Sequence, residues 1–476
     1  MINQNIKNKI STPILSYFKV EGLNGYKNIK ITLERNIKII STENGAGKTT
    51  LLNMLYSLLS GKANRLQRID FKKFTLKINK KDITYSKKQL FPQPIDSEKI
   101  RFPFPAGRFI YDALSKEDIH ELLNLYATDY NANFWKHKNI QKLLSDTPLE
   151  INDIREIFDE RINSICESSE DLLKLKKEIK ENLNEITILY LPTYRRIEAD
   201  LSEFDNSIFI ERNRRYHNFR RAQAENIESE QLIYFGLEDV EKRLNNITKE
   251  IRDATFEAYS RINARHLDQL VNIGIKNNHK KIEKEQINTI KVALARVGKS
   301  NTETENRIVN LIESGEINNP QYEQLEIHLN QLIEIYQEKS NSDQIIEDFI
   351  NVVNSYLGNE NSEKKFIFDK LTVDVQVINR HTNKTLHLNA LSSGEKQIVS
   401  IFNRLYLDKQ KQYLILIDEP ELSLSLEWQK KFLPDILNTP SCKQLIAITH
   451  SPFIFDNELD QYAGSLDISY NEVSNE

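Results

Sequence analysis

A short apolar strand that runs straight into a glycine-rich loop is the feature that most constrains this sequence. Residues 37–40 read Ile-Lys-Ile-Ile, and residues 42–49 read Thr-Glu-Asn-Gly-Ala-Gly-Lys-Thr. The apolar residues after the loop recur at helical spacing: Leu51, Leu52, Met54, Leu55, Leu58 and Leu59. A strand, a glycine loop and a buried helix in this order predict an α/β fold with a phosphate site at the start of the helix.

The loop carries the groups that a nucleotide needs. Lys48 would neutralise the β- and γ-phosphates of ATP, and the hydroxyl of Thr49 would bind Mg²⁺. Thr42 stands where the full pattern has a glycine. The alternative is an ordinary glycine turn before a helix. The candidate nucleotide-binding residues of the loop are Asn44, Gly45, Ala46, Gly47, Lys48, Thr49 and Thr50.

Two apolar runs near the C-terminus end in residues that can do chemistry. Residues 413–418 are apolar on both faces, which is typical of a central parallel strand, and carboxylates at its end stand where open α/β sheets bind ligands. We expect Asp418 to hold Mg²⁺ and Glu419 to orient and deprotonate the attacking water. Adjacent acids that merely ended a strand would repel each other. The run 444–449 ends at His450, for which a structural role is the alternative.

A serine-rich segment precedes these runs. Residues 391–397 read Leu-Ser-Ser-Gly-Glu-Lys-Gln, in which Ser392 and Glu395 have the spacing of a capping box. Gly394 permits close approach of a phosphate to the start of the helix. The alternative is simply a well-capped helix. Ser392, Ser393, Gly394 and Glu395 are therefore candidate binding residues.

In their order along the chain, these four motifs resemble those of ABC ATPases. The resemblance implies that residues 392–395 contact the γ-phosphate of ATP held by another copy, and hence a homodimer with two shared ATP–Mg²⁺ sites. It also implies catalytic roles for Lys48, Glu419 and His450, and it places residues 421–425 at the D-loop position. Gln89 and Gln93 are Q-loop candidates and Tyr26 is a candidate for adenine stacking; a solvated surface side chain is the alternative for either glutamine.

The length of 476 residues exceeds what one hydrophobic core usually organises. We expect an ABC-type ATPase head of the α/β class, split by a large, mainly helical insertion. The head would consist of residues 1–94 and 361–476, and the insertion of residues 95–360 would contain a core strand near 187–194.

Shorter patterns add detail to this plan. Residues 71–85 predict a β-hairpin, and residues 365–368, 371–377 and 385–388 predict strands. Within the insertion, a 3,4,3,4,3 spacing of apolar residues predicts the seam of a coiled-coil-like helix pair, too short for a confident coiled coil: Leu237, Val240, Leu244, Ile247, Ile251 and Ala254.

Composition narrows the class of protein. Hydrophobic residues make up 39% and charged residues 28%, which fits a folded, helix-rich chain. The formal charge is −4, so nucleic-acid binding would need a local basic patch. Arg212–Arg221 is the candidate, and a solvated helix face or a salt-bridged lobe is the alternative. Cys166 and Cys442 lack metal-ligand spacing and fit a reducing compartment. No apolar stretch approaches a membrane span, so a cytoplasmic location is expected.

The sequences of several segments resemble those of the PtuA-type ABC/SMC-like ATPases of Septu and retron-associated antiphage systems. The segments are 190–198, 235–239, 391–400, 418–425 and 449–454. This resemblance implies a homo-oligomer that regulates a separate HNH-type nuclease, PtuB. Related ATPases carry a nuclease domain after the switch histidine, but few residues follow His450, so we expect no nuclease domain in this chain.

Two other functions stay open. The first is a DNA-repair ATPase similar to SMC or RecF proteins, although the long arms of chromosome-maintenance ATPases are not evident in the sequence. The second is a nucleotide-sensing scaffold that binds ATP and hydrolyses little of it.

Overall fold

The computed structural model describes residues 9–41, 47–91, 106–128, 134–149, 151, 153–154, 157–158, 169–192, 237–271, 281–297, 302–358, 363–408 and 411–470. The chain forms two compact units. The first unit consists of Met1–Leu232, Lys411–Asn438 and Cys442–Glu476, and the second of Ile233–Gln410 and Thr439–Ser441. Each unit has its own sheet or sheets. The fold is α/β, which confirms the expected class.

A parallel sheet in the first unit joins strands from distant parts of the sequence. Its order is β12-β3-β11-β10-β6 and every pairing is parallel. The strands are β3 (Ile37–Ser41), β6 (Ile186–Leu191), β10 (Gln412–Asp418), β11 (Cys442–Thr449) and β12 (Ala463–Gly464). Because they run in one direction, their carboxyl ends lie along one edge. The expected buried strands before Glu419 and His450 are thereby confirmed as β10 and β11.

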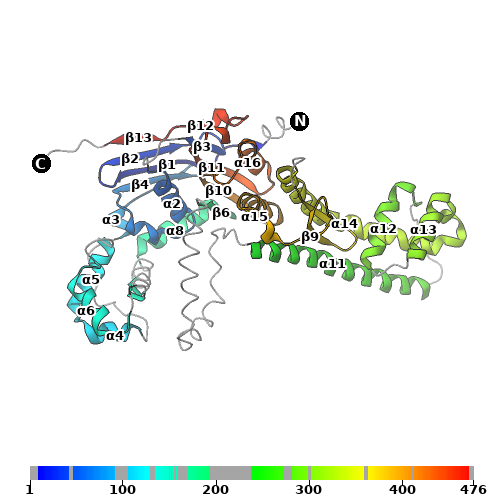
Figure 1. Ribbon diagram of the computed structural model, residues 1–476, viewed down its shortest axis with the longest axis horizontal. Coiled ribbons are helices and arrows are strands. Elements are labelled where there is room, and N and C mark those ends of the chain that lie inside the picture. Colours follow the sequence, from blue (N-terminus) through cyan, green and yellow to red (C-terminus); the bar gives the residue numbers. More distant parts are fainter. Residues whose placement is uncertain are drawn as a thin grey trace. The chain divides into compact units, whose positions relative to one another are not determined.

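An antiparallel sheet accompanies it in the first unit, in the order β13-β2-β1-β4-β5. Its strands are β1 (Leu15–Leu23), β2 (Lys27–Thr32), β4 (Lys73–Ile78), β5 (Lys81–Ser86) and β13 (Asp467–Tyr470). Strands β4 and β5 form the expected hairpin, and its turn uses Asn79 and Lys80 at positive φ. Figure 1 shows β1, β2 and β4 of this sheet in blue and β13, from the C-terminal end, in red at its edge.

One buried side chain connects the two sheets. Gln444, in β11, is 0% exposed, and its Oε1 accepts hydrogen bonds from the backbone N–H groups of Ile14 and Leu15 at 2.9 Å each. Its Nε2 donates to the carbonyl oxygen of Leu15 at 2.8 Å. The amide side chain therefore satisfies three backbone groups where β1 begins.

Helix α2 (Lys48–Leu59) fills the core beside the parallel sheet. Its apolar residues from Leu51 to Leu59 are buried, as their helical spacing predicts, and belong to one large apolar cluster with both sheets. Tyr56 stacks on Tyr190 of β6 with ring centroids 5.0 Å apart, and the Tyr190 hydroxyl donates to Asn53 at 2.9 Å. The burial of these residues holds α2 in the core directly after Gly47.

Further helices of the first unit, as far as the structure describes it, are short. They are η1 (Ala63–Arg68), α3 (Lys87–Leu90), α4 (Ala106–Ala113), α5 (Lys116–Thr128), α6 (Lys138–Asp146), α8 (Glu170–Leu183), α16 (Leu426–Asn438), η8 (Pro452–Ile454) and η9 (Asp460–Tyr462). Among them, α16 lies between β10 and β11 in sequence and contacts β11 and η8. It thus helps to place the loops that follow both strands.

The second unit consists mainly of helices. They are α11 (Leu237–Val271), η4 (Lys284–Gln286), α12 (Ile287–Val297), α13 (Thr302–Ser314), η5 (Glu316–Asn318), η6 (Pro320–Tyr322), α14 (Glu323–Leu357), η7 (Leu388–Ala390) and α15 (Ser393–Leu407). The apolar seam expected along residues 237–254 lies on α11, which contacts α14 and α15. Within the described residues, no helix is both long and apolar enough to cross a membrane.

A three-stranded antiparallel sheet completes the second unit: β7 (Lys364–Asp369), β8 (Asp374–Asn379) and β9 (Thr385–Leu386). The prediction of a strand at 371–377 was wrong at its start, because residues 370–373 form a turn. The Asp369 side chain accepts a hydrogen bond from the Leu371 N–H at 2.8 Å, and Val373 has a φ of 54°. A local side-chain bond of this kind competes with strand pairing.

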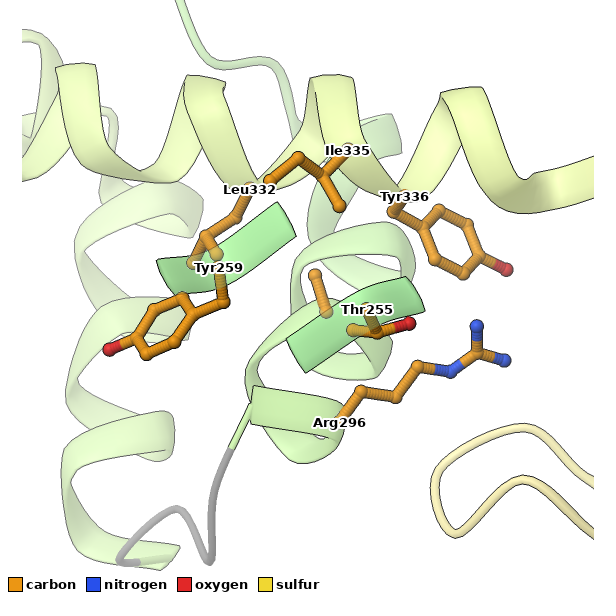
Figure 2. A pocket seen from close by; sticks show the side chains of 7 residues that line it. Thr255, Tyr259, Arg296, Leu332, Ile335 and Tyr336 are labelled. Carbon is orange, nitrogen blue, oxygen red and sulfur yellow. The ribbon is translucent and has the colours of Figure 1, made fainter. Parts of the chain in front are cut away.

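A buried ion pair stabilises the helices of the second unit. The Arg296 guanidinium, on α12, lies 2.7 Å from a carboxylate oxygen of Asp343 on α14, and both side chains are 3% exposed. Arg296 also donates to the carbonyl oxygen of Lys370 at 2.8 Å and lies over the ring of Tyr336. Figure 2 shows its side chain reaching toward Tyr336 beside a small hollow that Thr255 and Tyr259 of α11 also line.

Candidate functional site

The carboxyl edge of the parallel sheet collects the residues that the motifs predict. Asp418 pairs in register with Ile448, and Thr449 pairs with Ser41 at the end of β3. The glycine loop, Glu419 and His450 each follow directly from one of these neighbouring strands. Because ligands of open α/β sheets bind at the carboxyl ends of the strands, this edge is the candidate site.

Lys48 and His450 meet at this edge. The Lys48 Nζ lies 3.1 Å from Nδ1 of His450 and also contacts its Nε2. The His450 Nε2 lies 3.8 Å from a carboxylate oxygen of Glu419. Three side chains from three segments thus converge. Lys48 is only 6% exposed, so its amine is held in the site and does not extend into solvent.

The charges of the site act on one another. Burial lowers the pKa of Lys48 below its ordinary value, and the carboxylates of Glu419, Asp418 and Glu421 partly offset that effect. Burial likewise raises the pKa of Glu419, and Asp418 and Glu421 raise it further, while His450 and Lys48 act in the opposite direction. A carboxylate with a raised pKa is a better proton acceptor, which suits a general base.

The backbone bends sharply between the two adjacent acids. Glu419 has a φ of 52°, a left-handed conformation that is uncommon for a residue other than glycine, and its N–H donates to the Ile448 carbonyl oxygen at 2.8 Å. Such a conformation costs on the order of 1–3 kcal/mol and concentrates at functional sites. The Asp418 residue is 3% exposed, whereas the Glu419 side chain retains 30% exposure. The two acids therefore stand in different environments.

The start of α2 completes the described part of the phosphate loop. Gly47 has a φ of 91° and caps the helix without a side-chain hydrogen bond, and Thr49 and Thr50 lie in the first turn. A residue with a Cβ would be strained at Gly47. Asn44, Gly45 and Ala46, which were predicted to bind nucleotide, lie outside the described residues, as do Gln93 and the Arg212–Arg221 patch.

The chemistry of this edge fits Mg²⁺. Magnesium binds through one or two carboxylate or hydroxyl ligands together with substrate phosphates. Asp418 at the end of β10 and Thr49 at the start of α2 supply oxygen ligands of that kind, and Glu419 adds negative charge beside them.

The serine segment caps α15 in the second unit. The Glu395 N–H donates to Ser392 Oγ at 3.4 Å, and the Ser392 N–H donates to the Glu395 side chain at 2.6 Å, which confirms the predicted capping box. The Glu395 carboxylate also accepts from Lys364 at 2.8 Å. Ser392 and Ser393 are exposed, while Gly394 is buried. Glu395 is thus engaged within its own unit.

The structure shows the contacts of two further candidates, one for the Q-loop and one for adenine stacking. The Gln89 side chain accepts from the Ser86 N–H at 2.9 Å and so caps α3, a structural role. Tyr26 lies parallel to Tyr470 of β13 with ring centroids 6.2 Å apart.

Glu421 and Thr449 are residues of the site to which sequence reasoning gave no individual role. The Glu421 carboxylate accepts hydrogen bonds from Thr449, His450 and Ser451. The signals in the sequence were the D-loop position of residues 421–425 and the place of Glu421 two residues after Glu419, and neither reveals where its side chain points.

Comparison with solved structures gives similarity to many chains, among them three Smc heads. One is the Smc head domain with an extended coiled coil bound to the C-terminal domain of ScpA, derived from Pyrococcus furiosus (14% identity, 96% of this chain and 97% of that chain, TM-score 0.32). Another is an Smc head bound to the C-winged helix domain of ScpA (11% identity, 97% of this chain and 98% of that chain, TM-score 0.32). The third is an Smc head domain with a coiled coil and joint, derived from Pyrococcus yayanosii (15% identity, 96% of this chain and 97% of that chain, TM-score 0.31).

No curated protein matches the chain. A family model described as the AAA ATPase domain matches residues 14–455. The match spans both units, and it includes the glycine loop, Glu419 and His450. Since it covers most of the 476 residues, this chain belongs to the AAA ATPase domain family.

Proposed function

We propose that the carboxyl edge of the parallel sheet binds and hydrolyses ATP in the manner of ABC-type ATPases. The observation that carries the proposal is the convergence of Lys48, Glu419 and His450 from three separate segments at the ends of neighbouring strands. A cation for phosphate, a carboxylate with a raised pKa and an imidazole within reach of both are what in-line attack by water on a phosphate requires.

Each side chain has a distinct task in this proposal. Lys48 binds the β- and γ-phosphate oxygens, and Glu419 orients the attacking water and accepts its proton. His450, beside both, holds the γ-phosphate and the water in line. Thr49 and Asp418 hold Mg²⁺, which neutralises phosphate charge when bound. The positive end of α2, which begins at Lys48, adds further stabilisation of negative charge.

The second half of the site comes from another copy of the chain. Ser392 and Ser393 are exposed at the start of α15, a helix of 15 residues, where N–H groups favour an anion. We propose that residues 392–395 of one copy contact the γ-phosphate bound at Lys48 of the other. A homodimer, or a higher homo-oligomer, is then the active form.

The cellular role follows from the resemblance to PtuA-type ATPases. We propose that this chain, working in the cytoplasm, is the ATPase subunit of an antiphage complex and regulates a separate HNH-type nuclease. The Arg212–Arg221 segment, rich in arginine with interleaved aromatics, is the proposed contact for DNA. Copurification with the product of the neighbouring gene tests the partner, and a neighbour without a nuclease fold contradicts it.

The decisive experiment for the ATPase proposal is Glu419→Gln. The variant should bind ATP as tightly as the wild type and release phosphate at least about 100-fold more slowly, because it lacks the proton acceptor. Glu427→Gln, the same change at an exposed position of α16, is the matched control. Tight ATP binding with negligible turnover in the wild type would instead identify a nucleotide-sensing scaffold. Turnover that depends on DNA ends would favour a DNA-repair ATPase.

A further inference from the structure

The loop that carries His450 is held by one carboxylate. Glu421 lies in the connection between β10 and α16, and its Oε1 accepts hydrogen bonds from the backbone N–H groups of His450 at 2.6 Å and Ser451 at 3.1 Å. Its Oε2 accepts from the hydroxyl of Thr449 at 2.7 Å. All three donors belong to residues 449–451, the switch loop. Hydrogen bonds to a charged acceptor are about twice as strong as neutral ones.

A second set of bonds fastens the same loop to α16. The Ser451 hydroxyl donates to the Gln429 side chain at 2.6 Å, and Gln429 in turn donates to the carbonyl oxygen of Leu424 at 3.0 Å. Thr449 is 0% exposed, and its hydroxyl also accepts from the Ser451 N–H at 3.0 Å. The switch loop and the connection from Glu421 to Gln429 are therefore joined at two points.

The chemistry of Glu421 differs from that of the acids beside it. Both of its carboxylate oxygens are engaged by donors from the protein, whereas Glu419 faces the Lys48–His450 contact. A glutamine at position 421 would keep one acceptor oxygen and place an N–H₂ group opposite the Thr449 hydroxyl. A carboxylate offers an acceptor to all three donors, whereas with an amide the Thr449 hydroxyl would have to accept from the N–H₂ group and turn its own proton toward the Ser451 carbonyl oxygen, 3.3 Å away.

We propose that Glu421 is a positioning residue for His450: it fixes the backbone of the switch loop so that the imidazole meets Lys48 and Glu419. This inference rests on the proposed ATPase function, in which His450 acts at the γ-phosphate. The consequence is that the connection after β10 and the switch loop move as one body. A partner copy that displaced residues 421–425 would displace His450 with them.

Hydrolysis kinetics of Glu421→Gln test the proposal. We expect kcat to fall roughly 10- to 100-fold, as is usual when a supporting partner of a reactive side chain is lost, with ATP affinity changed by no more than about twofold. Glu427→Gln should leave both values at the wild-type level. A general loss of folding would instead lower Tm and ATP affinity together, and that result would overturn the positioning role.

A double-mutant cycle with His450→Ala tests whether Glu421 acts by positioning His450 or only supports the fold. If Glu421 acts through His450, then Glu421→Gln should change kcat by less than about twofold once the imidazole is absent. Additive losses would show that Glu421 acts by another route and would overturn the proposal. Thr449→Val, which removes one of the three donors in a similar volume, should produce a smaller loss of kcat in the same direction.

Hydrogen exchange provides a readout that does not depend on hydrolysis. In nucleotide-free protein, the amides of His450 and Ser451 should exchange faster in Glu421→Gln than in the wild type or Glu427→Gln, because their acceptor is weaker. Unchanged exchange would overturn the positioning role even if ATP hydrolysis is real. If Glu419→Gln instead hydrolysed ATP at the wild-type rate, the proposed function would fail, whatever the exchange experiment gave.

Discussion

The side-chain amine of Lys48 lies 3.1 Å from Nδ1 of His450, across 402 residues of sequence. The contact forms because β3, which precedes the glycine loop, and β11, which precedes His450, are neighbours in the parallel sheet. Glu419 and Asp418 add negative charge around the same amine. A phosphate that binds Lys48 therefore competes with His450 and these carboxylates for one cation.

Replacement of Lys48 should weaken nucleotide binding. Lys48→Ala removes the cation for the β- and γ-phosphates and also leaves the acids of the edge without a balancing charge, so ATP affinity should fall on the order of 10- to 100-fold. Titration of a fluorescent ATP analogue with Mg²⁺ measures the loss. Lys88→Ala, at an exposed position of α3, should bind like the wild type. If Lys48→Ala bound ATP as tightly as the wild type, Lys48 would have no role in binding phosphate.

The stability of the nucleotide-free protein should depend on the ionisation of Glu419. Its pKa is raised above the ordinary value of 4.5, mainly by burial, so the folded state binds this proton more tightly than the unfolded state does. The contribution of Glu419 to stability is thus fully present below pH 4.5 and is lost as pH rises through the raised pKa.

Glu419→Gln should consequently be more thermostable than the wild type at neutral pH. The gain should be within about 1 kcal/mol, and it should shrink as the buffer is changed from about pH 8 to about pH 5. Thermal unfolding of both proteins over this range, with Glu427→Gln as the reference, measures the effect. A difference in Tm that stayed constant with pH would have another cause than the titration of this carboxyl.

Gln444 should be essential for joining the two sheets of the first unit. Gln444→Leu fills a similar volume but leaves the N–H groups of Ile14 and Leu15 and the Leu15 carbonyl oxygen without their buried partner. Each unsatisfied group costs about 1–3 kcal/mol, so a total loss of several kcal/mol is expected. Urea unfolding measures it. Lys443→Ala, at the exposed neighbouring residue, should unfold like the wild type, and a small effect of Gln444→Leu would mean that β1 begins independently of β11.

Sequence patterns predict the local parts of this fold well. The apolar run Leu414–Ile417 is typical of a strand covered on both faces, the β4–β5 hairpin follows from alternation, and the capping box at Ser392 follows from spacing. Local sequence patterns do not predict features that depend on pairing between segments far apart in the sequence. Strand β13 pairs with β2 in an antiparallel register, and Gln444 bonds to β1, because the chain returns there from more than 400 residues away.

The chemistry of the site divides in the same way. Asp418, Glu419 and His450 could be predicted because they directly follow apolar strands whose ends meet in an α/β sheet. The bend at Glu419 and the direction of Glu421 could not, since each depends on loop backbone that no periodicity describes. The turn at 370–373 was not predicted for a similar reason: the hydrogen bond from the Leu371 N–H to the Asp369 side chain outweighs the β propensity of the segment.

The shared site makes a prediction that a single chain cannot satisfy. Lys48→Ala should disable the phosphate loop of its own copy, and Ser393→Arg should block the start of α15 in its own copy, so each variant alone should be inactive. If ATP is held between two copies, a mixed dimer has one intact site, and an equal mixture should recover roughly a quarter of wild-type turnover. Phosphate release after the two variants are mixed measures the recovery. If the phosphate loop and the serine segment instead acted within one chain, the mixture would recover no turnover, because neither variant contains a complete site of its own.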